Sequence, residues 1–262
     1  MYKFASTCNE KFFEGLLCFV YSIKKHNDFN FKYYVIDEDL SEKSKVRLKN
    51  LHSNVEFIKP HFEKYENLNT KTPKHLIPSL YKIECFRINE DQLMICDTDL
   101  LCLGNISHLF SFKEDFSVNN LMNENKKEIY QVNDNRPDFS AGIMIARNKY
   151  LGENIVDEII SYIGKPESEY HPYGDQPVLN TFFRNKQVRY FDRKWHAYKR
   201  YFSDNKNHFK IPGKNVNERI KCFDPKIIHY AGIKPWLGQD NSDDTYHHIE
   251  KIWKKYYLEI NE

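Results

Sequence analysis

The sequence predicts an α/β fold, in which helices pack on a mostly parallel central sheet. Strand-like and helical segments alternate through the first third of the chain, and such alternation is typical of a parallel sheet covered by helices. The 262 residues are 40% apolar and 15% aromatic, which is enough to fill the core of one large domain. The chain shows no internal repeat, low-complexity tract or linker. We therefore expect a single domain over residues 1–262, with a partly irregular second half.

The first third supplies the elements of the sheet in turn. Short runs rich in Tyr, Phe, Val and Ile predict strands, and apolar residues at every third or fourth position predict helices. Ser41 precedes one helical segment and is the expected N-cap, because a serine hydroxyl accepts from N–H groups of the first turn. The expected order is strand 2–7, helix 11–26, strand 31–37, helix 41–51, strand 55–60, helix 80–88 and strand 92–96.

The second half is less regular. The segment FSAGIMIAR (139–147) is apolar on both sides of a glycine and predicts a buried strand. The polar segment 203–218, which contains Gly, Pro and Asn, predicts a loop. Apolar residues at helical spacing predict a final helix; they are Ile249, Ile252, Trp253, Tyr256 and Tyr257. The other expected elements are helix 154–163, a helix that opens within 174–183, strand 188–192 and strand 226–232.

Composition argues against several classes of protein. Lys and Arg number 39 against 37 Asp and Glu, and no recognition motif appears, so we expect no nucleic-acid partner. The six cysteines form no C-x-x-C pair, which favours a reducing compartment. The apolar stretch 15–23 follows Glu10 and Glu14 and lacks a small-residue cleavage site, unlike a signal peptide. No run approaches the roughly 20 apolar residues of a membrane span. We expect a cytoplasmic protein that could also rest on a membrane surface.

Two carboxylates, Asp97 and Asp99, directly follow the strand 92–96 in the sequence DTD. In an open α/β sheet, ligands bind where strands end at their carboxyl side. A solvated surface turn is the alternative for D-x-D, but apolar segments flank this pair on both sides. Burying ionised carboxylates without partners costs free energy. A divalent cation such as Mg²⁺ or Mn²⁺ would neutralise them, because such cations prefer oxygen ligands.

A second candidate site lies in the stretch IIHYAGIKPW (227–236). A strand-like entry leads to His229, which can ligate Mn²⁺ through its imidazole. Gly232 would allow backbone to approach a ligand closely, and the ammonium of Lys234 could pair with a phosphate. The alternative is a buried histidine bonded to backbone, with glycine and proline as turn residues. The presence of D-x-D in the same chain favours the ligand-binding interpretation.

The chain resembles the glycogenin-like and lipopolysaccharide-galactosyltransferase-like family of retaining glycosyltransferases, glycosyltransferase family 8, which has the GT-A fold. The resemblance rests on motifs that occur in the family's order between residues 4 and 236. These motifs are FASTCNEKF, LYKIECF, DTDLLCLGNISHLF, FSAGIMI, GDQPVLNTFF and HYAGIKPW. The resemblance implies one Rossmann-like nucleotide-binding domain. Its nucleotide-binding half would be 1–110, its sugar and acceptor half 111–240, and its C-terminal helix 241–262.

The resemblance also implies roles for individual residues. Asp97, Asp99 and His229 would hold a divalent metal, usually Mn²⁺ but alternatively Mg²⁺, that bridges the phosphates of a UDP-sugar. Asp175 and Gln176 would face the donor sugar as catalytic residues. The remaining expected donor contacts are Ala5, Thr7, Asn9 and Phe12 at the uracil and ribose, and Lys82, Thr98, Ser140, Gly142, Gly232 and Lys234 elsewhere along the donor.

The implied reaction is retaining transfer of a hexose, glucose or galactose, to a saccharide of a surface glycan, lipopolysaccharide or glycoprotein. Front-face displacement is favoured, and double displacement through Asp175 or Gln176 stays open. A noncatalytic nucleotide-sugar binding module and a self-glycosylating primer using one of the 18 tyrosines are alternatives. A homodimer is compatible with the sequence. The lysine-rich C-terminal tail could dock on the domain or contact anionic lipid.

Three residues depart from the family pattern. Only Ile233 separates Gly232 from Lys234, where two residues are usual. Ser140 stands where Asn is common, and His196 stands where Asn often follows the tryptophan. We expect these changes to affect the position of Lys234, the contacts to the donor sugar and the contacts to the acceptor, respectively.

Overall fold

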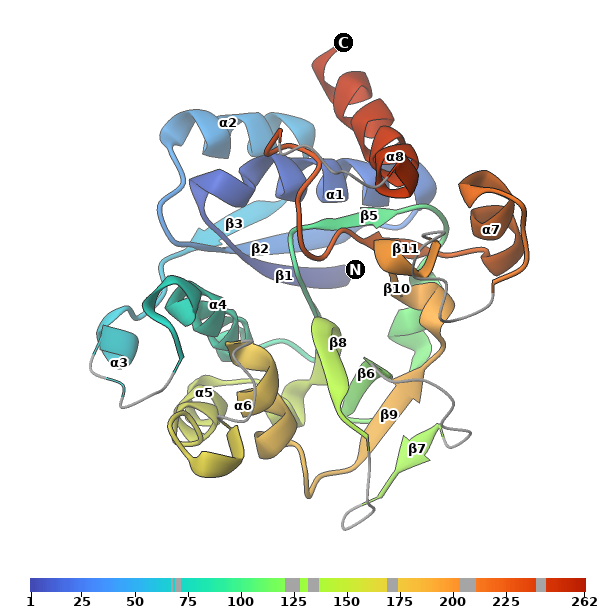
Figure 1. The fold of residues 1–262 in the computed structure, drawn as a ribbon. Coiled ribbons are helices and arrows are strands. Elements are labelled where there is room, and N and C mark those ends of the chain that lie inside the picture. The colour runs from blue at the N-terminus through green and yellow to red at the C-terminus, as the bar shows by residue number, and fades with distance from the viewer. Residues whose placement is uncertain are drawn as a thin grey trace.

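A central sheet with helices on both faces and a smaller sheet beside it make up the fold (Figure 1). The computed structural model describes residues 1–66, 68, 72–120, 128–131, 137–168, 174–202, 211–238 and 244–262.

Eight strands form the central sheet, in the order β3-β2-β1-β4-β8-β6-β9-β7. Their bounds are Tyr2–Cys8 (β1), Phe31–Asp37 (β2), Val55–Ile58 (β3), Gln92–Cys96 (β4), Phe116–Asn120 (β6), Ile129–Tyr130 (β7), Phe139–Arg147 (β8) and Val188–Phe191 (β9). From β3 to β4 every pairing is parallel, as predicted. Around β8 the sheet is mixed, because β8 runs antiparallel to both β4 and β6. The parallel half places the carboxyl ends of β1, β2 and β4 at one edge.

Helices cover both faces of this sheet (Figure 1). Side chains alternate between the faces along each strand, so Phe4 contributes to one apolar cluster and Ala5 to the other. The first cluster is covered by α1 (Phe13–His26) and α2 (Glu42–Leu51). The second is covered by α5 (Glu153–Ile160), α6 (Asp175–Phe182) and a 3₁₀ helix, Tyr81–Arg87. Ser41 caps α2 as predicted, its hydroxyl accepting from the Ser44 N–H at 3.2 Å.

A three-stranded sheet, β10-β11-β5, lies beside the central one. Its strands are β5 (Leu100–Cys102), β10 (Ala197–Tyr198) and β11 (Ile227–His229). β11 pairs antiparallel with β5, with His229 opposite Leu100. The predicted C-terminal helix is α8 (Asp244–Asn261), and it buries Ile249, Trp253 and Tyr256 in the cluster that also contains β10 and β11. The apolar side of the tail is thus docked on the domain.

The structure corrects two of the predicted elements. In place of one helix over 80–88 there are two short ones, α4 (Ile77–Leu80) and the 3₁₀ helix. The predicted loop 203–218 is wrong at its end, because α7 (Val216–Phe223) begins inside it; residues 203–210 lie outside the described residues. Asn215 caps α7 by accepting from the Glu218 N–H at 3.0 Å. The predictions also lacked the short strands β5, β6, β7 and β10 and the one-turn helix α3 (Glu63–Glu66).

The structure has all six cysteines as free thiols. Five are buried and Cys222 is exposed. Among the helices of the described ranges, none combines the length and apolar content needed to cross a membrane.

Candidate active site

A cleft of about 410 Å³ opens at the carboxyl ends of β1, β2 and β4. This is the edge of the sheet at which α/β proteins bind their ligands. Nine of the residues implied as donor contacts or catalytic groups line the cleft: Thr7, Asn9, Phe12, Lys82, Asp97, Thr98, Asp99, Asp175 and Lys234.

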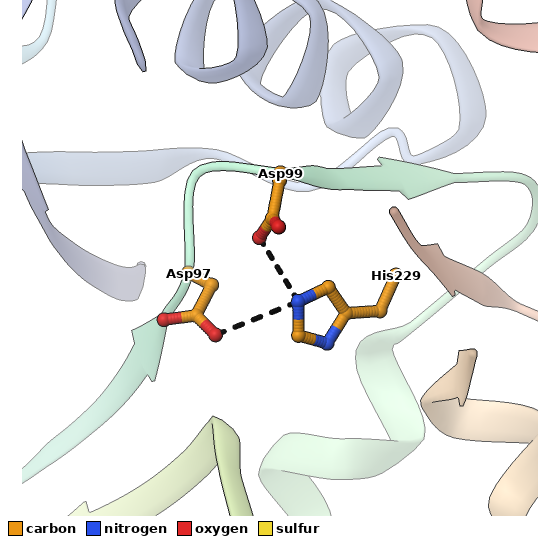
Figure 2. A group of neighbouring side chains, drawn as sticks. All are labelled: Asp97, Asp99 and His229. Carbon is orange, nitrogen blue, oxygen red and sulfur yellow. Dashed lines mark ion pairs between the residues drawn. The ribbon is translucent and has the colours of Figure 1, made fainter. Parts of the chain in front are cut away.

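The side chains of Asp97 and Asp99, which line the cleft, meet that of His229 (Figure 2). Asp97 follows β4, Asp99 precedes β5, and β11 carries His229 to the same point. Nε2 of His229 lies 3.0 Å from Oδ1 of Asp99 and 3.6 Å from Oδ2 of Asp97, so both carboxylates approach the same nitrogen (Figure 2). The candidate ligand atoms all lie within 4.8 Å of one another. Two carboxylates and an imidazole in this geometry suit a divalent cation.

Two lysines compensate the carboxylates. Nζ of Lys82 lies 2.5 Å from Oδ1 of Asp97 and 2.8 Å from Oδ2 of Asp175, and Lys234 pairs with Asp99. Burial alone would raise the pKa of Asp99, but His229 and Lys234 outweigh it and hold that pKa well below its usual range. Burial would lower the pKa of Lys82, and the charges of Asp175 and Asp97 raise it instead. The buried charges are thus neutralised by amines from two other elements.

A buried layer supports His229 from behind. Nδ1 of His229 lies 2.8 Å from Nε2 of His196, so one of these nitrogens donates to the other. With a proton on Nδ1, the Nε2 lone pair of His229 would be available to ligate a cation held by the two carboxylates. Tyr198 stacks on His229 with ring centroids 4.9 Å apart, and its hydroxyl bonds to Oγ of Ser140 at 2.6 Å. A Cβ on Gly142 would lie 2.8 Å from the His196 ring. The structure therefore places Ser140 and Gly142 in this supporting layer, outside the cleft lining.

The N-terminus of α6 carries the two implied catalytic residues. Asp175 lines the cleft and pairs with Lys82. Gln176 is not among the described lining residues, and its Oε1 accepts from the Ala141 N–H at 3.4 Å. The first turn of α6 therefore directs Asp175 into the cleft, while Gln176 bonds to the backbone of β8.

The turn after β11 brings Lys234 into the cleft despite its shorter spacing from Gly232. Gly232 has a φ of +86°, a conformation that favours glycine, while a Cβ there would meet nothing within 4 Å. Position 232 therefore favours glycine because of its backbone conformation, and a side chain there would meet no steric obstacle. The carbonyl of Ile233 accepts from Nζ of Lys199 at 2.6 Å, and Nε1 of Trp236 donates to the Lys11 carbonyl at 3.0 Å. These contacts tie the turn to the 3₁₀ helix after β10 (Lys199–Phe202) and to the 3₁₀ helix before α1 (Glu10–Phe12).

Thr7 and Asn9 line the cleft at the end of β1, and the Phe12 ring lies 5.7 Å from Nζ of Lys234. Ala5 lies deeper in β1, fully buried in the apolar cluster under the 3₁₀ helix, and does not line the cleft. Glu38, which the sequence analysis did not single out, lies here between the ends of β1 and β2. Its position directly after a predicted strand was the signal that could have identified it.

The sequence profile of the family described as glycosyl transferase family 8 matches residues 3–240. The chain belongs to glycosyltransferase family 8. This family 8 chain is 23% identical over 238 residues to the glycosyltransferase GlyB of Streptococcus pneumoniae serotype 4 (strain ATCC BAA-334 / TIGR4), an alignment that covers 87% of this chain and 54% of GlyB. It is 24% identical over 255 residues to GlyE of the same strain, covering 90% of this chain and 56% of GlyE. The chain spans about half the length of these curated relatives.

Solved structures show the same fold. The galactosyltransferase LgtC, crystallised with donor and acceptor sugar analogues, superposes with a TM-score of 0.72 at 14% identity, covering 98% of this chain and 95% of LgtC. GlyE of Streptococcus pneumoniae TIGR4 superposes with a TM-score of 0.66 at 18% identity, covering 98% of this chain and 60% of GlyE. The predicted GT-A fold is confirmed.

In this family 8 chain, Gly174 fixes the start of α6, and Gly174→Ala will destabilise the fold. Gly174 has a φ of +61°, and an added Cβ would lie 1.7 Å from Oγ of Ser79. Gly238 is a matched control, because its φ is +64° and a Cβ there meets nothing within 4 Å. We expect Gly238→Ala to cost about 1–2 kcal/mol through backbone strain, and Gly174→Ala to cost more in urea denaturation. Equal losses of stability in the two variants would show that the Ser79 side chain moves aside without a measurable cost.

Proposed function

We propose that the chain transfers a hexose, glucose or galactose, from a UDP-sugar to a saccharide acceptor, with a divalent cation and with retention of anomeric configuration. The observation that carries the proposal is the convergence in one cleft of the Asp97–Asp99–His229 group, Lys234 and Asp175. A ligand with adjacent phosphate and sugar moieties suits this arrangement. Membership of family 8 supports the reaction class.

The residues present fit a divalent metal. Two carboxylates supply hard oxygen ligands, and the imidazole favours Mn²⁺ over Mg²⁺, which rarely takes nitrogen ligands. When bound, the cation would supply positive charge where the departing diphosphate becomes negative. Lys234 adds a second positive charge at the same place, because its amine already lies beside Asp99.

The reaction that we propose breaks the bond between the anomeric carbon and the diphosphate oxygen, and forms one from that carbon to an acceptor oxygen. In front-face displacement, the departing phosphate takes the acceptor's proton. Asp175 would hold the donor sugar and stabilise positive charge on it, with Gln176 beside it. Double displacement would need Asp175 or Gln176 as a nucleophile. The pairing of Asp175 with Lys82 at 2.8 Å lowers its nucleophilicity and supports the front-face route.

We propose an acceptor within a surface glycan, a lipopolysaccharide or a glycoprotein. The likeness to a galactosyltransferase crystallised with sugar analogues of both substrates supports transfer from sugar to sugar. A noncatalytic nucleotide-sugar binding module is the second candidate, but such a module has no need of Asp175 beside the phosphate site. The unpaired cysteines support action in a reducing compartment, the cytoplasm.

A UDP-release assay with a panel of UDP-sugars tests the proposal. We expect slow, Mn²⁺-dependent hydrolysis of one UDP-hexose without an acceptor, and none with a chelator. A saccharide acceptor should accelerate release, and the product's anomeric proton coupling, measured by NMR, should report retention. UDP binding without release under any condition would favour the binding module. Release that is unaffected by chelator would contradict the metal-dependent mechanism.

A further inference from the structure

Glu38 is a carboxylate in the cleft that none of the roles above uses. It directly follows β2, and its backbone N–H donates to the Cys8 carbonyl at 3.1 Å, which fixes it against the end of β1. Its side chain is half-buried and receives two hydrogen bonds from β1 and the residue after it. Oγ1 of Thr7 donates to Oε1 at 3.1 Å, and Nδ2 of Asn9 donates to Oε2 at 3.3 Å. The carboxylate is therefore held in one orientation.

The hydrogen bonds to Glu38 leave part of its capacity unused. An ionised carboxylate offers about four lone-pair sites, and Thr7 and Asn9 occupy two of them. In the described ranges of the chain, the side-chain partners of Glu38 are the neutral Thr7 and Asn9, and no lysine or arginine is among them. Burial raises the pKa of Glu38, although the bonds from Asn9 and Thr7 lower it. A further neutral donor from a ligand would therefore stabilise the ionised side chain.

The strand order locates Glu38 along the cleft. Asp97 follows β4, Thr7 lies on β1 and Glu38 follows β2, and these three strands are consecutive neighbours in the sheet. Neighbouring strands are about 4.8 Å apart, so the ends of β4 and β2 are separated by roughly 10 Å. A nucleoside diphosphate whose phosphates lie at Asp97, Asp99 and Lys234 would cross the end of β1 with its ribose. Its base, the part farthest from the phosphates, would reach Glu38.

We propose that Glu38 determines the choice of base by accepting the ring N3–H of uracil. Uracil carries a donor at this ring position, whereas cytosine carries a lone pair there, which a carboxylate repels. This inference rests on the proposed function and names the residue that makes the donor a uridine nucleotide.

Calorimetric binding of UDP and CDP to the Mn²⁺-loaded protein tests this role. A hydrogen bond to a charged group gives an expected preference of the wild type for UDP of about 10- to 100-fold. In Glu38→Gln, the amide can present a donor to cytosine. UDP binding should therefore weaken by about 10-fold, CDP binding should not weaken, and the preference should approach one. Glu42→Gln is the control, because Glu42 is an exposed carboxylate on the adjacent α2, outside the cleft. It should retain the wild-type preference.

A second measurement needs no variant. Methylation of N3 should reduce binding of the uridine diphosphate to the wild type by about 10-fold or more. Equal binding of the methylated ligand, or an equal loss of UDP and CDP binding in Glu38→Gln, overturns the role of Glu38. Loss of the Glu38→Gln effect with 2′-deoxy-UDP would assign the carboxylate to a ribose hydroxyl instead. If the wild type binds no uridine diphosphate at all, the proposed function fails too, whereas UDP binding with an unchanged preference contradicts only the base-selecting role.

Discussion

Replacing Asp99 with asparagine will abolish metal-dependent transfer while the protein remains folded. Asp99 is almost completely buried, 3.0 Å from His229 and paired with Lys234. Asparagine retains the shape and one acceptor oxygen but removes the charge that a divalent cation needs. We expect turnover in the UDP-release assay to fall by about 10²- to 10³-fold or more. This is the loss seen when one electrostatic contact to a transition state is removed. His229→Ala should cause a similar loss.

Asp37 provides a matched control for this substitution. It is also a buried aspartate at the end of a strand, and it pairs with Lys45 at 3.0 Å and Lys59 at 2.9 Å, but it does not line the cleft. Asp37→Asn should lower the free energy of unfolding without changing the Mn²⁺ concentration that gives half-maximal activity. An Asp99→Asn protein with wild-type rates and wild-type metal dependence would remove Asp99 from the metal site.

Lys82→Met will strongly destabilise the protein near neutral pH. The methionine matches the length of the lysine, but it leaves Asp97 and Asp175 without the amine that lies 2.5 Å and 2.8 Å from their oxygens. Removing one partner of a buried ion pair costs about 3–5 kcal/mol. Lys64→Met is the control, because Lys64 also bonds two carboxylates, Glu153 and Asp157, but at the surface. That change should cost less than about 1 kcal/mol.

The cost of Lys82→Met will depend on pH. Burial raises the pKa of Asp175, and Lys82 opposes that increase, so the variant's Asp175 pKa will rise further. A carboxyl whose pKa is higher in the folded state binds its proton more tightly when folded. Its unfavourable contribution therefore appears above the unfolded pKa of about 3.9 and grows with pH up to the folded pKa. Urea denaturation should show a smaller difference from wild type at about pH 4 than at about pH 7. A difference independent of pH would contradict the ion-pair explanation.

The sequence predicted the strands that form the site because their apolar patterns are local and strong. The ends of β1, β4 and β11 carry Thr7, Asp97 and His229, and each strand was expected from its own residues. The proximity of Lys82 and Lys234 to the D-x-D pair was predicted only from the order of the family's motifs. Local patterns do not encode it, because these residues are far apart along the chain.

Other features depend on tertiary contacts and escaped the sequence analysis. The strands β5 and β10 have only three and two residues, so pairing rather than pattern defines them. The motif order suggested a donor contact for Gly142, yet its Cβ position is filled by His196. Helix α7 did have a signal, because Asn215 and Glu218 form a capping pair, which polar composition masked. Glu38 directly follows a predicted strand, but it lies among several acidic residues, and the sheet order is what places it beside β1 in the cleft.

Titration of Mn²⁺ in the presence of UDP, followed by electron paramagnetic resonance of the free ion, decides whether this cleft holds the metal. We expect the wild-type protein to remove one equivalent of free Mn²⁺ signal. Asp99→Asn and His229→Ala should bind Mn²⁺ about 10-fold more weakly or worse while keeping a wild-type circular dichroism spectrum. Binding of Mn²⁺ with the same affinity and stoichiometry in folded Asp99→Asn and His229→Ala would contradict the assignment of the metal to this cleft.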